Sequence, residues 1–359
     1  MSLVALTPEF RLLADACRRS FAGADSAGPL LQDEGSIDWS RFLRTARFHR
    51  VQGLVWRALR RQRVPPPIAE ALKTDAEAIA IANLRAAAGS RELLAAFDDA
   101  GVALLFVKGL TLGVLAYGGV ASKSAADIDI LVAEDDVARA AELLRRCGYG
   151  LVVPQADEDV SAWHRQAKES LWANENAGLH VDLHSRLADN RALIPTLTVN
   201  SPSCCVEVSP AIALPTLTDD ELFAYLAVHG ASSLWFRLKW LTDFAALLHP
   251  KDGAEIERLY RRSQMLGAGH AAGQGLLLAD AIYGTLTDCP SLRDELSRDP
   301  GHRWLLEQAL KQLAGKPEPV EPTSARLGTL RIHLAQFALL PGLRFKIGEL
   351  IRQARAALS

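Results

Sequence analysis

Hydrophobic side chains recur three and four positions apart at both ends of the chain, which is the spacing of one face of an α-helix. Near the N-terminus this spacing runs through Phe10–Ala14 and Trp39–Leu59, and an alanine-rich stretch from Ile68 to Ala100 continues it. The same spacing returns after Thr218. In this last part we predict helices over residues 219–231, 237–249, 254–265, 270–284, 327–339 and 343–357.

The middle of the chain has a different pattern, in which short apolar runs are bounded by glycine or charged residues. Val102–Val107 is a continuous apolar run, which is typical of a strand buried on both faces. Helices are expected over residues 110–117, 134–147 and 158–171. Strands are expected over residues 102–107, 127–132, 151–153, 179–184 and 204–208.

These elements predict an α+β fold. A small mixed sheet would form the core, over residues 96–215. An N-terminal helical region (1–95) and a C-terminal helical domain (216–359) would flank it.

The composition excludes several classes of function. The chain has 359 residues and a net charge of −2, so it lacks the broad positive field that binds long nucleic acid. Its five cysteines include no Cys-x-x-Cys pair, which favours free thiols in a reducing cytosol. We find no signal peptide and no run of about 18 apolar residues. With its arginine and alanine bias, the chain is expected to be a bacterial cytoplasmic protein that does not enter the membrane.

The candidate chemistry begins with Asp127-Ile128-Asp129, which opens the strand expected over 127–132. Side chains alternate along a strand, so both carboxylates lie on one face and Ile128 lies on the other. Two carboxylates this close repel each other and are costly to desolvate. A divalent cation relieves both effects, and Mg²⁺, which prefers oxygen ligands and substrate phosphates, is the ion we expect.

A phosphate-binding turn is expected at Lys108-Gly109, between the first strand and the next helix. Gly109 lets a ligand approach the backbone, and amides at a helix N-terminus bind phosphate oxygens. Lys108 would neutralise charge there. Lys123 lies four residues before Asp127 in an expected loop, where its side chain could also reach phosphates.

A third segment, His180-Val181-Asp182-Leu183-His184, places three metal-binding side chains on one strand face. If this strand neighbours the first, Asp182 becomes a third carboxylate beside Asp127 and Asp129. Three carboxylates can hold two metal ions, and Asp182 could also act as a general base. The alternative is a mononuclear metalloenzyme that uses His180, Asp182 and His184 alone.

The order strand, Lys-Gly, helix, Asp-x-Asp resembles the nucleotidyltransferase superfamily of the DNA polymerase β type. More narrowly, it resembles a family of uncharacterised bacterial nucleotidyltransferases that carry Lys-Gly in this turn. The resemblance covers most of the chain. Its other pieces are His49-Arg50-Val51, Gly148-Tyr149, Val181-Asp182-Leu183-His184, His229, Arg237-Leu238-Lys239-Trp240 and Asp243.

The resemblance implies that Asp127, Asp129 and Asp182 bind metal and catalyse the reaction. It also implies that C-terminal helices wall the nucleotide site. This wall would include Arg237, Lys239 and Asp243, and His184 would lie beside the nucleotide. The chain departs from the family pattern in having Lys123 where arginine is usual and Ser185 where an aromatic residue follows the histidine. The first change keeps the charge but loses a bidentate donor.

The expected reaction is in-line attack of an acceptor oxygen on the α-phosphorus of a nucleoside triphosphate, ATP being the commonest donor. One of two Mg²⁺ ions would assist the attacking oxygen, and the other would stabilise the leaving pyrophosphate. The acceptor is left open among a small molecule, a sugar, a peptide and a protein. The alternative from another class is a non-catalytic nucleotide-binding or regulatory protein with the same fold.

Overall fold

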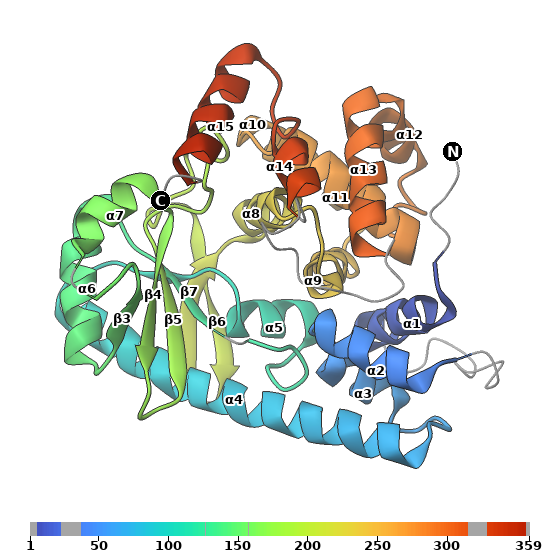
Figure 1. Ribbon diagram of the computed structural model, residues 1–359, viewed down its shortest axis with the longest axis horizontal. Helices are drawn as coiled ribbons and strands as arrows, with labels where there is room; N and C mark the ends of the chain where they lie inside the picture. Colours follow the sequence, from blue (N-terminus) through green and yellow to red (C-terminus); the bar gives the residue numbers. More distant parts are fainter. Residues whose placement is uncertain (1–5, 23–36, 126, 157, 315–328, 357–359) are drawn as a thin grey trace. The chain divides into compact units, whose positions relative to one another are not determined.

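The computed structural model describes residues 6–22, 37–125, 127–156, 158–314 and 329–356 (Figure 1). The chain forms two compact units. Residues Glu77–Leu222 make one, which we call the sheet unit, and Met1–Ala76 with Phe223–Ser359 make the other, the helical unit. The boundaries expected at residues 95 and 215 stay a prediction.

The sheet unit contains a five-stranded sheet in the order β1-β2-β5-β4-β3. β2 and β5 are parallel, and the other neighbouring pairs are antiparallel, so the sheet is mixed, as expected for an α+β core. The strands are β1 (Leu105–Phe106), β2 (Ile128–Leu131), β3 (Gly150–Val153), β4 (Glu169–Asn174) and β5 (Leu179–His184).

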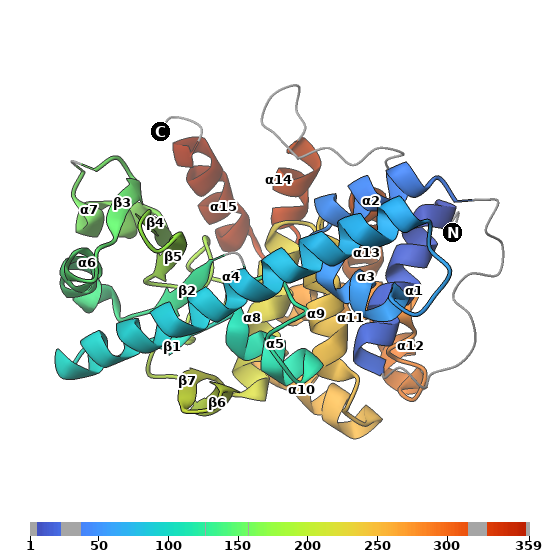
Figure 2. The ribbon, with the colours of Figure 1, turned by 90° about the horizontal axis from the view of Figure 1, so that it is seen from below.

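One face of this sheet packs into a hydrophobic core. Ile128 and Ile130 of β2 lie in one buried cluster with Leu93 and Phe97 of helix α4 (Pro66–Asp99). Leu144 of α6 (Val137–Arg146) belongs to the same cluster. Figure 2 shows the C-terminal half of α4 running past β1 and β2. Because alternate residues of β2 point into this core, Asp129 points to the opposite face.

Helices and a hairpin complete the sheet unit. Residues 134–147, expected as one helix, form a short 3₁₀ turn (Glu134–Asp136) followed by α6. The strand expected over 204–208 is confirmed as the first arm of a hairpin whose second arm, Ile212–Leu217, was not expected. The remaining elements are α5 (Leu110–Tyr117), α7 (Val160–Gln166), β6 (Ser203–Ser209) and β7 (Ile212–Leu217).

The helix expected over 158–171 is wrong in its second half. α7 ends at Gln166, and β4 begins at Glu169. Along β4 the side chains of Ser170 and Trp172 are fully buried while Glu169 is partly exposed, which is the alternation of a half-buried strand. Pairing with β5 along its whole length outweighs the local helical pattern.

The helical unit is built from helices alone among its described residues. The expected stretch 39–59 divides into two helices at His49–Val51, where Arg50 has a φ of 55°. Asp38 caps the first of them by accepting a hydrogen bond from the Arg41 amide at 2.9 Å. These N-terminal helices are α1 (Pro8–Ala22), α2 (Trp39–Phe48) and α3 (Gln52–Leu59).

The C-terminal helices agree with the expected ranges to within one to three residues, but two more occur between residues 290 and 313. No described helix is long and apolar enough to cross a membrane. The helices are α8 (Asp219–Ser232), α9 (Leu238–Leu248), α10 (Gly253–Met265), α11 (Gly269–Tyr283), α12 (Pro290–Arg298), α13 (Pro300–Leu313), α14 (Leu330–Gln336) and α15 (Leu343–Ala356).

Candidate active site

Two carboxylates meet on the polar face of the sheet. β2 and β5 run parallel with Asp129 directly opposite Asp182, and Ile128 opposite Val181. Register partners on parallel strands point to the same face, so the two carboxylates project together. Single ligand atoms of Asp129, Asp182 and His184 all lie within 4.8 Å of one another. The structure therefore brings the second acidic segment beside the first, as the sequence predicts.

Lys108 reaches this cluster from the turn after β1. Its Nζ lies 2.6 Å from Oδ1 of Asp129, and both side chains are mostly buried. Gly109, the N-cap of α5, has φ 64° and ψ −119°, a conformation essentially restricted to glycine. Thr111 closes the turn by donating a hydrogen bond from its hydroxyl to the Lys108 carbonyl at 3.1 Å. The Lys-Gly turn thus places the ammonium group of Lys108 against the carboxylate of Asp129.

His184 lies between two acidic groups. Its Nε2 is hydrogen-bonded to Oδ1 of Asp129 at 3.2 Å, and its Nδ1 is 3.2 Å from Oε2 of Glu169. Glu169 is the register partner of His184 on β4, and Lys168 lies 3.2 Å from the same Oε2. The imidazole is 1% exposed, and its hydrogen bond to Asp129 orients the ring.

The three acidic groups have different proton affinities. Burial raises the pKa of Asp129, but Lys108 and His184 outweigh it and hold that pKa well below its usual range. Burial also raises the pKa of Glu169, and Lys168, His184 and Lys108 more than offset it, bringing the pKa to about 2. For Asp182, burial and then the negative charge of Asp129 raise the pKa to about 7. A cation at Asp182 would remove both penalties.

Asp127 precedes β2 and is half-buried. Its negative charge makes a small contribution to the raised pKa of Asp182. It lines a small cavity of about 10 Å³ with Lys108, Gly109 and Asp129. That volume suits one water-sized ligand. Among the described residues of this site, the three ligand atoms that lie within 4.8 Å of one another belong to Asp129, Asp182 and His184, and Asp127 is not one of them.

His180 stays outside this group. It lies on β5 two residues before Asp182, but it is exposed, and the ligand atoms that converge are those of Asp129, Asp182 and His184. The geometry of the described residues thus favours a site shared by β2 and β5 over one built from His180, Asp182 and His184 alone.

The structure buries Lys123. Only 3% of it is exposed, and its backbone carbonyl accepts a hydrogen bond from Asn83 at 2.7 Å. Its side chain packs against α5, 3.8 Å from where a Cβ on Gly113 would lie. Lys123 therefore lies in a loop, as expected, and its side chain is enclosed. Any contact with a triphosphate stays a prediction.

Arg237, Lys239 and Asp243 belong to the helical unit. Arg237 is 5% exposed, donates a hydrogen bond to the Phe48 carbonyl, and places its guanidinium 4.7 Å from the centre of the Phe48 ring. The amides of Leu238 and Lys239 donate to Nδ1 and the carbonyl of His49 at 3.1 and 3.3 Å.

Burial, and then Arg237, lowers the pKa of His49 to about 3, so the ring is neutral and can accept the Leu238 hydrogen bond. Two motifs of the resemblance, His49-Arg50-Val51 and Arg237-Leu238-Lys239, are therefore hydrogen-bonded to each other. Asp243 is 3% exposed on α9. A nucleotide-wall role for Arg237, Lys239 and Asp243 stays a prediction.

Lys168 and Glu169 were not expected at the site. The helical interpretation of 158–171 places them on a helix, away from β5. Glu169-Ser170-Leu171-Trp172 reads polar, polar, apolar, apolar, so its residue types give no period-two signal that would have indicated a strand. Once β4 is recognised as a strand, its pairing with β5 brings Glu169 opposite His184.

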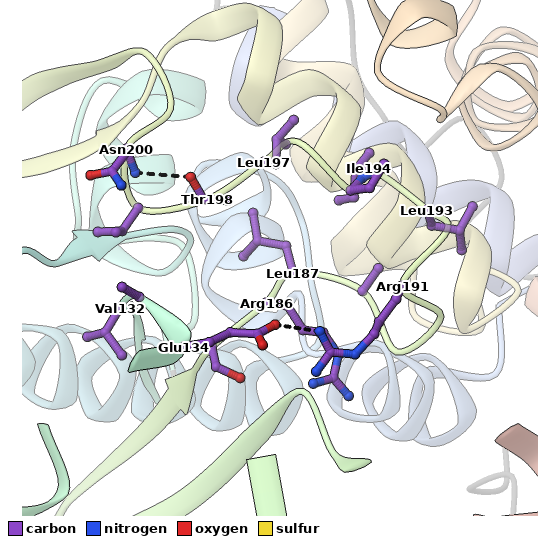
Figure 3. Close-up of a pocket in the computed structure, with 15 residues that line it drawn as sticks. Val132, Glu134, Arg186, Leu187, Arg191, Leu193, Ile194, Leu197, Thr198 and Asn200 are labelled. Atoms are coloured by element: carbon purple, nitrogen blue, oxygen red, sulfur yellow. Dashed lines mark hydrogen bonds and ion pairs between the residues drawn. The ribbon is translucent and has the colours of Figure 1, made fainter. Parts of the chain in front are cut away.

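A larger cavity of about 260 Å³ lies beyond the carboxyl ends of β2 and β5 (Figure 3). Its walls are mostly apolar and include Leu187, Leu193 and Leu197. At its rim Arg191 pairs with Glu134 at 2.6 Å, and both side chains are about half exposed. No residue of the Asp129–Asp182 cluster lines it, so the cavity and the cluster are separate features of the sheet unit.

A comparison with protein families matches residues 35–284 to a family described as an uncharacterised nucleotidyltransferase. The match covers more than half of the chain and includes both acidic strands, the Lys-Gly turn and the Arg237–Asp243 segment. No curated protein matches the chain. The family match agrees with the mixed sheet, its helical flanks and the paired carboxylates, and on this evidence the chain belongs to that nucleotidyltransferase family.

Proposed function

We propose that the protein is a Mg²⁺-dependent enzyme that transfers a nucleoside monophosphate, AMP from ATP, to an acceptor oxygen and releases pyrophosphate. The observation that carries this proposal is the juxtaposition of Asp129 and Asp182 on neighbouring parallel strands, with Lys108 on the same carboxylate. An acceptor hydroxyl, phosphate or carboxylate would attack the α-phosphorus, and the α–β phosphoanhydride bond would break.

The donor set fits a divalent cation. Asp129 and Asp182 supply hard oxygen ligands, and the raised pKa of Asp182 reflects a negative field that a cation would neutralise. Asp127 would add a third carboxylate from the same side. When bound, Mg²⁺ would neutralise the phosphate charge and the charge of the leaving pyrophosphate.

The residues of the chain have separate tasks in this proposal. Lys108, at the turn capped by Gly109, would bind a phosphate oxygen once Asp129 is neutralised by another cation. Asp182, with a pKa of about 7, is suited to accept the proton of an acceptor hydroxyl near neutral pH. His184, fixed between Asp129 and Glu169, would orient the Asp129 carboxylate.

The experiment is label transfer. Wild-type protein is incubated with α-labelled nucleoside triphosphates, Mg²⁺ and cell extract, and both the labelled product and pyrophosphate are measured. Transfer should be lost in Asp129→Asn and Asp182→Asn. It should persist in Glu134→Gln, which removes an exposed paired carboxylate of the same unit.

A non-catalytic nucleotide-binding protein would give a different result. It would bind a non-hydrolysable ATP analogue with Mg²⁺ but release no pyrophosphate with any extract. Binding without turnover would therefore count against the transfer reaction while leaving the metal site intact.

A further inference from the structure

A second group of metal-binding side chains lies in the helical unit, apart from the acidic strands. His270 stands at the start of α11, and Asp299 and His302 stand at the start of α13. One ligand atom from each of the three lies within 4.8 Å of the others. The proposed transfer reaction uses none of these residues, and the family match ends before Asp299 and His302.

The first histidine has its tautomer fixed. Nδ1 of His270 lies 2.8 Å from the carbonyl oxygen of Ala338. A carbonyl can only accept, so Nδ1 carries a hydrogen, and Nε2 of the neutral ring keeps its lone pair for a ligand. Metal-binding histidines commonly donate the other ring N–H to a backbone carbonyl in this way.

The second histidine is buried with no hydrogen-bond partner. His302 is 4% exposed, and neither of its ring nitrogens is hydrogen-bonded. A Cβ on Gly273 would come within 2.5 to 2.7 Å of three ring atoms, so only glycine at 273 leaves room for the ring. A buried polar group without a partner costs free energy, and a bound ion would supply a partner to one of the two nitrogens.

Asp299 retains one oxygen for a ligand. Its Oδ1 caps α13 by accepting hydrogen bonds from the amides of Gly301 and His302 at 2.7 and 3.0 Å. These bonds orient the carboxylate, and Oδ2 takes no part in them. The cap therefore holds the aspartate in place beside the two imidazoles.

We infer that His270, Asp299 and His302 form a binding site for a divalent transition metal, with Zn²⁺ as the best-suited ion. Two imidazoles and one carboxylate are a common zinc donor set, whereas Mg²⁺ prefers oxygen ligands alone. The ion would tie the N-terminal end of α11 to that of α13. The site is independent of the proposed reaction, because its ligands and its preferred ion differ from those of the acidic strands.

The test is equilibrium Zn²⁺ binding to the full chain after removal of metal by a chelator. Competition with a fluorescent zinc indicator gives the affinity, and Co²⁺ substitution gives an absorption spectrum that reports nitrogen and oxygen ligands. We expect one tight site in the wild type. His270→Gln should weaken it by at least about tenfold. Asp299→Asn should weaken it as much while keeping the helix cap, because asparagine also caps helices.

Two matched variants separate this site from other histidines and from the acidic strands. His333→Gln removes an exposed histidine of the same unit, and Asp129→Asn removes a ligand of the other candidate site. Both should keep the tight zinc site and its cobalt spectrum. The proposal is overturned if the wild type binds no Zn²⁺ more tightly than His270→Gln does. It is equally overturned if the tight site disappears in Asp129→Asn and survives in Asp299→Asn.

Discussion

Asp129 and Asp182 lie 53 positions apart in the numbering yet are direct register partners on parallel strands, and Lys108 Nζ sits 2.6 Å from the first of them. Asp129 is thereby ionised, whereas Asp182, with a pKa of about 7, is half protonated at neutral pH. This asymmetry, more than the number of acidic groups, determines how the site should respond to substitution and to pH.

Replacing Asp129 with asparagine should reduce pyrophosphate release by at least about 100-fold, because the change removes the ionised ligand and the partner of Lys108. The assay is pyrophosphate release with labelled ATP and Mg²⁺. Thermal unfolding of the variant is measured in parallel, since an unpaired buried lysine also costs stability. Retention of full activity in a folded Asp129→Asn protein would remove Asp129 from the mechanism.

Mg²⁺ affinity should rise with pH. Because the pKa of Asp182 is about 7, the metal must displace a proton below pH 7, so affinity should increase about tenfold per pH unit there and level off above it. Titration calorimetry between pH 5.5 and 8.5 measures this dependence. In Asp182→Asn the slope should vanish, whereas in Glu134→Gln it should persist.

The same carboxyl predicts a pH dependence of stability in the absence of metal. Unfolded Asp182 ionises near pH 4, but the folded protein keeps its proton up to about pH 7. The folded state therefore binds more protons in this window, and this group's contribution to the free energy of unfolding falls as pH rises from about 4 to 7. Asp129 and Glu169 have lowered pKa values, so their contribution to the free energy of unfolding is instead lost as pH falls below about 4.

Chemical denaturation at several pH values separates these contributions. Near pH 4 Asp182→Asn should be no more stable than wild type through this effect. As pH rises from 4 to 7, the free energy of unfolding of the variant should increasingly exceed that of the wild type. A uniform offset at every pH would show that the substitution acts through packing instead.

Gly109→Ala should destabilise the sheet unit by about 1–3 kcal/mol, because alanine is strained at φ 64° and ψ −119°. Gly118→Ala is the matched control at the other end of α5. Gly118 is exposed in the left-handed region at φ 71° and ψ 17°, where alanine costs about 1 kcal/mol. Denaturant titration should rank Gly109→Ala as the more damaging. If the turn presents Lys108 to a phosphate, only Gly109→Ala should also raise the KM for ATP.

Arg237→Lys should lower the free energy of unfolding by about 1.5–3 kcal/mol, because it breaks a charge-assisted hydrogen bond to the partly buried Phe48 carbonyl. The lysine keeps the charge but not the planar group over the Phe48 ring. Lys239→Gln, at a partly exposed position, serves as the comparison. A change in the KM for ATP without a loss of stability would instead assign Arg237 to the nucleotide wall.

The sequence predicts the acidic site better than its surroundings. Asp129 and Asp182 each lie on an apolar strand with period two, and that pattern indicates which residues share a face within each strand. That the two strands are neighbours with Asp129 opposite Asp182 comes from the structure. Glu169 was missed because its strand follows directly after a short helix, and pairing with β5, a non-local contact, decides its conformation.

Two helices, α12 and α13, lie outside every helix expected from hydrophobic spacing. Pro290 and Pro300 occupy the first position of each, where proline is favourable because no amide hydrogen is needed there. A proline in that position looks the same in sequence as one that ends a helix. The burial of Lys123 is likewise invisible locally, since it depends on Gly113 of α5 and on Asn83 of α4.

The helical unit is assembled from the two ends of the chain, and its contact between Arg237 and Phe48 joins residues 189 apart. During synthesis, α1 to α3 leave the ribosome long before their partners in α9 exist. The sheet unit is continuous in sequence and has all of its strands once residue 217 has emerged. During synthesis the sheet unit should therefore fold first. Helices α1 to α3 can pack into the helical unit only after the last third of the chain has been made.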